Sequence, residues 1–133
     1  MKQGRTVLEA KRYGIFSCRV ETSLLDVARL LLERDISSLV VLDEAEALRG
    51  IISRTDLLQA CLEHDEWAVQ TVADYMSTDV VTVTPQTLLC DVAELLLQNH
   101  IHRVVVVREE DGVQYPVAVV SDGDFIYHMV KEA

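Results

Sequence analysis

The sequence has little glycine and proline, with five Gly and two Pro among its 133 residues. Disordered and fibrous chains are usually rich in these residues, and half of this chain is hydrophobic, so both classes are excluded. Basic residues are also scarce, with 12 Lys and Arg against 22 Asp and Glu, which gives a formal net charge of -10. Such a chain repels phosphate polyanions and anionic lipid surfaces, and we therefore expect no nucleic acid among its partners.

The sequence also has few cysteines, no histidine spacing typical of metal sites and no long apolar runs. The three cysteines Cys18, Cys61 and Cys90 are odd in number and form no CxxC motif, so a reducing cytoplasm is the simplest compartment. The histidines show no HxxxH or HExxH spacing, and we expect no metal site. No apolar run approaches the roughly eighteen residues that span a bilayer, and the N-terminus does not resemble a signal peptide. We expect a soluble, cytoplasmic protein that does not contact a membrane.

What the sequence does contain is an internal repeat. Residues 6–43 align with residues 71–108 without a gap, and about a third of the aligned positions are identical. After a short lengthening of the second copy, 50–57 aligns with 118–125, so that a Ser and an Asp three residues apart recur. We therefore expect a first repeat over 6–63, a connector over 64–70 and a second repeat over 71–131.

Each copy has the same predicted elements. Ser23 followed by Asp26 resembles a capping box and predicts a helix over 23–34. Apolar runs of branched residues predict buried strands, and each copy then continues through an acidic turn and a second strand into a closing helix. The expected ranges are strands 39–42 and 104–107, turns 43–46 and 109–112, strands 48–52 and 117–120, and helices 54–63 and 122–131. The fold class is α/β (α+β), with two βαββα repeats packed as a pseudo-twofold pair, because a lone repeat leaves an apolar sheet face bare.

The closing helices are expected to have apolar sides, and an outward position of Leu58, Leu62, Ile126 and Met129 would suit a structural dimerisation domain equally well. In the first helix Cys61 lies on such a side and predicts an inert core thiol. The residues expected on these sides are Leu57, Leu58, Cys61 and Leu62 in the first copy, and Phe125, Ile126, Met129 and Val130 in the second.

Several weak motifs in a fixed order resemble the CBS domain, the module named after cystathionine β-synthase. In the second copy they are residues 72–83, 85–89, 101–107 and 119–124, and the first copy matches more loosely at 36–41 and 50–56. The resemblance covers nearly the whole chain and is that of a stand-alone tandem pair, or Bateman module. It implies clefts that hold adenosine-containing ligands and a disc-shaped homodimer assembled through the helices.

The two Ser-x-x-Asp corners are the first candidate site. A carboxylate offers two acceptor oxygens to the two neighbouring hydroxyls of a ribose, and the start of the following helix suits a phosphate. The resemblance implies ribose contacts for Asp56 and Asp124, and phosphate-side contacts for Ser53, Thr55 and Ser121. The alternative is that these residues only cap helices, which Ser and Asp do in many proteins.

The second candidate is His102-Arg103, just before a buried strand. The resemblance implies that both face the phosphates of a ligand; the alternative is a solvated strand end. The first copy has Ser37-Ser38 there, with Arg54 and Arg19 as partial substitutes, so the second copy is expected to hold the stronger site. Asp122 opposes a polyanion, which favours ligands with few phosphates.

Base recognition is expected from the first strand of each copy. The resemblance points to Ser17, Thr82 and Thr84, where a purine could lie between aliphatic side chains. Each of these residues, taken singly, suits a plain core strand equally well.

The resulting hypothesis is a non-enzymatic regulatory module. It binds an adenosine nucleotide such as AMP, ADP or ATP in the cleft between the repeats, and it signals through the packing of its homodimer or through an effector protein in trans. No cofactor is obligatory, and S-adenosylmethionine and NAD rank behind the adenine nucleotides. One alternative is a purely structural dimerisation or adaptor protein without a ligand. Another is an enzyme acting on nucleotides, although no catalytic set is evident in the sequence.

Overall fold

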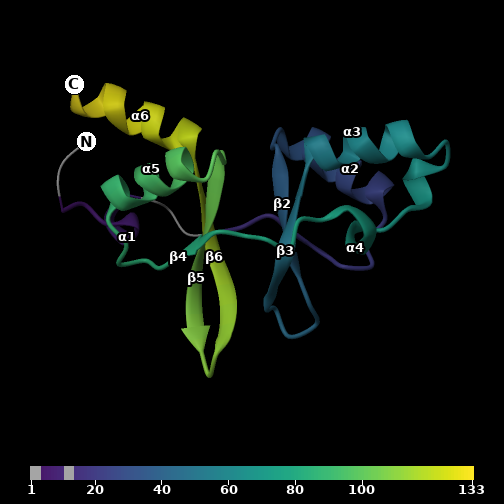
Figure 1. The fold of residues 1–133 in the computed structure, drawn as a ribbon, viewed down its shortest axis with the longest axis horizontal. Helices are drawn as coiled ribbons and strands as arrows, with labels where there is room; N and C mark the ends of the chain where they lie inside the picture. The colour runs from purple at the N-terminus through teal and green to yellow at the C-terminus, as the bar shows by residue number, and fades with distance from the viewer. Residues whose placement is uncertain (1–3, 11–13) are drawn as a thin grey trace. The chain divides into compact units, whose positions relative to one another are not determined.

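The structure is a computed structural model that describes residues 4–10 and 14–133, and it contains two compact units (Figure 1). One unit spans residues 15–80 and contains strands β1 to β3; we call it the β1–β3 unit. The other, the β4–β6 unit, joins residues 81–133 to the described residues up to Gly14. Residues 6–10 are part of the first sequence repeat but pack in the β4–β6 unit, and residues 71–80 are part of the second repeat but pack in the β1–β3 unit. The two repeats thus exchange their first segments.

Backbone hydrogen bonds hold these two exchanged segments. Helix α1 (Val7–Ala10) begins where Val7 N–H donates to the carbonyl of Thr87 at 3.0 Å, and Val7 is fully buried in the core of the β4–β6 unit. Helix α4 (Val72–Tyr75) begins in the same way, with Val72 N–H donating to Thr22 at 2.9 Å. Val72 is buried in the core of the β1–β3 unit.

The β1–β3 unit has the predicted βαββα order. Its sheet has the order β1-β2-β3, with β1 parallel to β2 and β2 antiparallel to β3. Ser23 caps α2 as predicted, since its hydroxyl accepts from Asp26 N–H at 3.2 Å. The elements are β1 (Ser17–Arg19), α2 (Leu24–Arg34), β2 (Ser38–Leu42), β3 (Leu48–Ser53), α3 (Arg54–Glu63) and the 3-10 helix η1 (Trp67–Val69).

The β4–β6 unit repeats this topology, with sheet order β4-β5-β6. The register shifts between Val41 and Leu42 in one sheet and between Val106 and Val107 in the other, which are equivalent positions of the repeat. The elements are β4 (Thr82–Val83), α5 (Leu89–Gln98), β5 (Arg103–Glu110), β6 (Val113–Ser121) and α6 (Asp122–Glu132). The mixed α+β fold with two three-stranded sheets is thus confirmed.

The second hairpin is longer than predicted. Strands β5 and β6 run to Glu110 and from Val113, so that only Asp111 and Gly112 form the turn, both with positive φ (52° and 78°). This is the backbone that a two-residue hairpin turn requires, and the Asp-Gly pair supplies it. Figure 1 shows the β5–β6 hairpin extending beyond the helices of its unit.

Helices cover one face of each sheet. In the β4–β6 unit, the alternate strand residues Val104, Val106 and Val120 share a core with α5 and α6. In the β1–β3 unit, Leu39 and Val41 have the corresponding role under α2 and α3. Neighbouring residues of a strand point to opposite faces of the sheet. A strand residue next to one of these core residues therefore points to the face that the helices do not cover.

The closing helices bury only part of their apolar sides. In α3 only Ala60 is buried and Leu57 partly so, while Leu58, Cys61 and Leu62 are exposed, the last at 89%. The expectation that Cys61 is a core thiol is therefore wrong. In α6 the buried residues are Phe125 and His128, while Ile126, Met129 and Val130 are exposed. Each short helix turns only a narrow stripe to its sheet, so the other apolar side chains lie outward.

No helix among the described residues is long and apolar enough to cross a membrane. In the same part of the chain, no group of three or more His, Cys, Asp or Glu side chains is arranged to hold a metal ion.

Candidate functional site

The corner between β6 and α6 is built by a reciprocal cap. Asp124 Oδ2 accepts from the backbone N–H of Ser121 at 2.8 Å and from its hydroxyl at 3.3 Å. Ser121 is the N-cap residue of α6, and Asp124 is the third residue of the helix. A carboxylate has about four lone-pair positions, so a cap of this kind is compatible with a ligand on the same group.

The corner between β3 and α3 has the same geometry. Asp56 Oδ2 accepts from Ser53 N–H at 2.8 Å and from the Ser53 hydroxyl at 3.1 Å. Both Ser-x-x-Asp motifs are therefore capping boxes, as the capping interpretation predicts. Thr55, the remaining candidate on this corner, is exposed in the first turn of α3.

Arg103 lies beside the second corner. It is the register partner of Ser121 across the β5–β6 ladder. Its neighbour Val104 points into the helix-covered core, so Arg103 and Ser121 share the sheet face that the helices leave uncovered. Thr82 is placed on this same face, because Val83 next to it belongs to the core.

Further contacts hold the β4 candidates. Thr82 Oγ1 accepts from Gln114 Nε2 at 3.2 Å. Thr84 N–H donates to the hydroxyl of Thr87 at 3.1 Å, which closes the turn after β4. Of the predicted residues in the β4–β6 unit, Arg103, Ser121 and Thr82 are thus brought to one sheet face, with Asp124 at its corner.

The β1–β3 unit places its candidates in the equivalent way. Ser53 pairs with Ser38, which stands where the other unit has Arg103. Ser17 is exposed and lies next to Cys18, which is buried in the helix-covered core, so Ser17 points to the uncovered face. This corner therefore repeats the carboxylate and hydroxyl groups but has serine in place of the guanidinium.

His102 contacts Asp122 directly, and the charge of Arg103 also acts on the Asp122 carboxylate. His102 lies on the helix side, where its Nδ1 is 2.9 Å from Asp122 Oδ2 and both side chains are largely exposed. The Asp122 N–H also donates to the carbonyl of His102 at 2.9 Å. The hydrogen bond from His102 is the main reason that the pKa of Asp122 lies below its ordinary value.

His102 and Asp122 line a groove between α5 and α6 of about 640 Å³, and Ile126 and Met129 form part of its apolar wall. Arg54 lines the equivalent groove between α2 and α3, of about 370 Å³. Both residues thus line a groove beside their corner, and their phosphate-side roles stay predictions.

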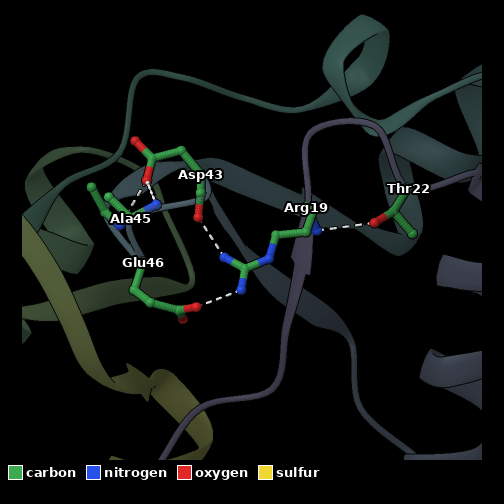
Figure 2. Close-up of polar contacts among 6 residues, drawn as sticks. Arg19, Thr22, Asp43, Ala45 and Glu46 are labelled. Carbon is green, nitrogen blue, oxygen red and sulfur yellow. Dashed lines mark hydrogen bonds and ion pairs between the residues drawn. The ribbon is translucent and has the colours of Figure 1, made fainter.

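Arg19 does not reach the first corner (Figure 2). It lies at the far end of β1, level with Leu42, whereas the Ser53 corner is level with Ser38. Its guanidinium donates to the carbonyl of Asp43 and to the carboxylate of Glu46, as Figure 2 shows. Asp43 in turn accepts from Ala45 and Ala47 N–H at 2.9 and 3.0 Å. Arg19 thus fastens β1 to the β2–β3 turn.

Sequence reasoning did not single out His128. This residue lies one helical turn after Asp124 and is 9% exposed, the one buried polar residue among those described. The i, i+4 spacing from Asp124 was the available signal, because residues at that spacing lie on the same helix face.

The family model of the CBS domain matches residues 10–63 and 72–131. The chain belongs to the CBS domain family. Its two matched segments coincide with the two βαββα repeats described above, so this is a pair of CBS domains.

Several CBS proteins resemble the chain over most of its length. The mitochondrial CBS domain-containing protein CBSX3 of Arabidopsis thaliana is 27% identical over 120 residues, which cover 86% of this chain and 56% of that protein. Inosine-5'-monophosphate dehydrogenase of Nitrosopumilus maritimus is 29% identical over 119 residues, which cover 85% of this chain and 24% of the enzyme. The chain thus spans about half or less of the length of these two relatives.

Solved structures agree with the fold. CBSX2 in complex with AMP superposes with a TM-score of 0.81 at 27% identity, covering 96% of this chain and 98% of that one. The CBS domain pair of protein MJ0100, in complex with 5-methylthioadenosine and S-adenosyl-L-methionine, has a TM-score of 0.84 at 22% identity, with coverage of 97% and 98%. Adenosine-containing ligands are therefore found in solved CBS pairs of this fold.

Proposed function

We propose that this CBS pair is a regulatory module that binds an adenosine-containing nucleotide at its Ser-x-x-Asp corners. One observation carries the proposal: in the β4–β6 unit, Asp124 caps the corner at Ser121, and Arg103 is the register partner of Ser121 across the β5–β6 ladder. The similarity to CBSX2, which was solved with AMP, supports the choice of an adenine nucleotide.

Each group has a role that follows from its chemistry. The Asp124 carboxylate accepts from the two ribose hydroxyls, and the Ser121 hydroxyl and the start of α6 face the phosphate. Arg103 donates to the phosphate oxygens through its planar guanidinium. Thr82 and Thr84, on and next to the neighbouring strand β4, form the base side.

The β1–β3 unit provides a second, weaker corner. Asp56 takes the ribose role, Ser53 and Thr55 lie toward the phosphate, and Ser17 lies toward the base. Because Ser38 replaces the arginine, this corner lacks one charge-assisted bond. The preference for AMP over adenosine should therefore be smaller here than at the β4–β6 corner.

Calorimetric titration with matched ligands separates these roles. In the protein with Asp56→Asn, which weakens the other corner, AMP is compared with adenosine and with 2'-deoxy-AMP. Losing one hydrogen bond to a charged group predicts binding about 10- to 100-fold weaker. We expect Arg103→Gln to reduce the preference for AMP over adenosine, and Asp124→Asn to reduce the preference for ribose over deoxyribose.

Asparagine at position 124 is chosen because its amide oxygen can still accept from Ser121 N–H and keep the helix cap. Glu132→Gln, at the far end of α6, is the matched charge-removing control and should leave all three affinities unchanged. If neither variant alters the selectivity between ligands, the corner is a helix cap alone. If no adenosine ligand binds the parent protein, the proposed function is wrong.

We also infer that a second copy of the chain covers the helical face. The exposed apolar side chains gather on the outer sides of the two helix pairs at equivalent positions, including Leu32, Leu58 and Leu62 in one unit and Leu97, Ile126 and Val130 in the other. Repeated apolar patches of this kind are typical of subunit interfaces. A ligand could then act by favouring one dimer arrangement over another, or one contact with an effector protein.

Light scattering tests this second part. We expect a dimer for the native chain and a monomer for the variant Leu58→Asp/Ile126→Asp, because an unpaired carboxylate in an apolar interface is strongly unfavourable. Exposed Leu8→Asp, on α1, is the control and should remain dimeric. A stable dimer that binds no adenosine ligand would favour the alternative function, a structural dimerisation domain.

A further inference from the structure

A small gap lies behind the Asp124 carboxylate, inside the β4–β6 unit. Its volume is about 10 Å³, which is roughly what one water molecule needs. It is enclosed by residues of α1, α5, β6 and α6: Ala10, Leu89, Val120, Asp124, Phe125 and His128. Apart from Asp124 and His128, this lining is apolar.

His128 lines this gap and has an unsatisfied buried nitrogen. The residue is 9% exposed, and its Nδ1 is fully buried without a hydrogen-bond partner among the described residues. A buried polar atom that makes no hydrogen bond is unfavourable, so such atoms usually contact an internal water. An aliphatic residue would fill the same space without this cost.

The other repeat provides an internal comparison. The position equivalent to His128 is Ala60 in α3, one turn after Asp56, and it is fully buried. The two corners therefore have the same Ser-x-x-Asp cap but differ in what lies behind the carboxylate. An alanine satisfies the packing of this helix stripe in one unit, so packing alone does not require a histidine in the other.

We propose that the gap holds one buried water that bridges His128 Nδ1 and the Asp124 carboxylate, which makes His128 a positioning residue for the ribose-binding group. The water has two polar partners, which is the minimum for a stable internal site. By donating to a carboxylate oxygen from behind, the water fixes the rotamer of Asp124 while leaving its outer lone pairs to a ligand. The role in ligand binding rests on the proposed function; the water site does not.

A crystal structure of the unliganded protein tests the water site directly. We expect one ordered water within about 3.2 Å of both His128 Nδ1 and a carboxylate oxygen of Asp124. An empty gap, or a protein atom bonded to Nδ1, would overturn the proposal. This measurement needs no variant and no ligand, so it is informative even if nucleotide binding fails.

Two variants test the positioning role, both in the Asp56→Asn background. His128→Asn places an amide atom close to where Nδ1 was and can keep the water, whereas His128→Phe fills the space without a polar atom. We expect AMP affinity within about twofold of the parent for asparagine and about three- to tenfold weaker for phenylalanine. The discrimination between AMP and 2'-deoxy-AMP should fall only in the phenylalanine variant.

The discrimination between AMP and 2'-deoxy-AMP distinguishes a role of His128 in positioning Asp124 from a role in the stability of the fold. If His128→Phe binds AMP as tightly and as selectively as the parent, His128 has no role in positioning Asp124. If both variants lose AMP equally while the water is present in the crystal, the histidine acts through packing and the positioning role is refuted. Absence of AMP binding by the parent refutes the proposed function instead, and the crystal structure still decides the water site.

Discussion

Replacing Gly50 with alanine should destabilise the β1–β3 unit by about 2–4 kcal/mol, although the change adds only a methyl group. Gly50 lies in β3, and the segment around Ser77 crosses directly over it. A Cβ at Gly50 would lie 2.5 Å from the backbone oxygen of Ser77 and 3.1 Å from Met76 Sδ. Its φ lies outside the left-handed region, so the effect of alanine here is one of space rather than of backbone conformation.

The magnitude follows from what must move. Ile51 N–H donates to Ser77 O and Ser77 N–H donates to Ile51 O, each at 2.9 Å. Displacing the Ser77 backbone loses both bonds, at about 0.5–1.5 kcal/mol each. It also shifts Met76, which packs against the core that contains Ile52. Overpacking of this kind adds at least about 1 kcal/mol, which brings the total to about 2–4 kcal/mol.

Urea unfolding at constant pH measures this change, and hydrogen exchange locates it. For a chain of this length the predicted loss corresponds to a melting temperature lower by about 8–15 °C. The amide of Ile51 should lose its protection first. A free energy of unfolding within about 0.5 kcal/mol of the parent would refute the argument.

Gly123→Ala is the matched control. Gly123 is the second residue of α6, and a Cβ there would meet only the Ser121 hydroxyl at 3.6 Å, an ordinary contact. Alanine favours a helix over glycine by up to about 1 kcal/mol, so this substitution should stabilise the protein. Replacing glycine with alanine should therefore lower the free energy of unfolding at position 50 and raise it at position 123. A general effect of glycine replacement does not explain this difference.

Two further predictions follow from ionisable groups. Burial raises the pKa of the Cys18 thiol to about 12, whereas Cys61 is exposed. Iodoacetamide at pH 8 should therefore label Cys61 in the folded protein and Cys18 only after unfolding. Rapid labelling of Cys18 in the folded protein would contradict its placement in the core. Hydrogen bonding to His102 lowers the pKa of Asp122 in the folded protein below its ordinary value of 3.8. The stability that this pair contributes is therefore fully present above pH 3.8 and is lost as the pH falls through the pKa of the folded protein. An NMR titration of the Asp122 carboxyl should show its midpoint rising in His102→Ala, and an unchanged midpoint would exclude the contact.

Local features of the fold were predictable from the sequence because their causes are local. The capping boxes at Ser53 and Ser121 join groups three residues apart, and the Asp111-Gly112 turn depends on its own backbone. The βαββα order followed from hydrophobic periods within single elements. Detection of the repeat added the expectation that both halves share one topology.

The candidate site was only partly predictable. That Ser121 and Asp124 meet could be expected from their spacing, but the direction of His102 could not. His102 lies just outside β5, where strand alternation does not apply, and its contact with Asp122 depends on where α6 begins. The outward position of Cys61 and the inward position of His128 were not predictable for the same reason. In a short helix with many apolar residues, the sequence does not indicate which side faces the core.

The sequence by itself thus determined the doubled βαββα unit and its two capped corners, since short-range hydrogen bonding and periodicity are encoded in neighbouring residues. Tertiary structure alone decided that α1 and α4 each pack in the unit of the other repeat. It also decided that Gly50 lies beneath Ser77, and that a histidine nitrogen lies buried behind one carboxylate but not the other. These depend on contacts between residues far apart in the chain, which no local pattern records.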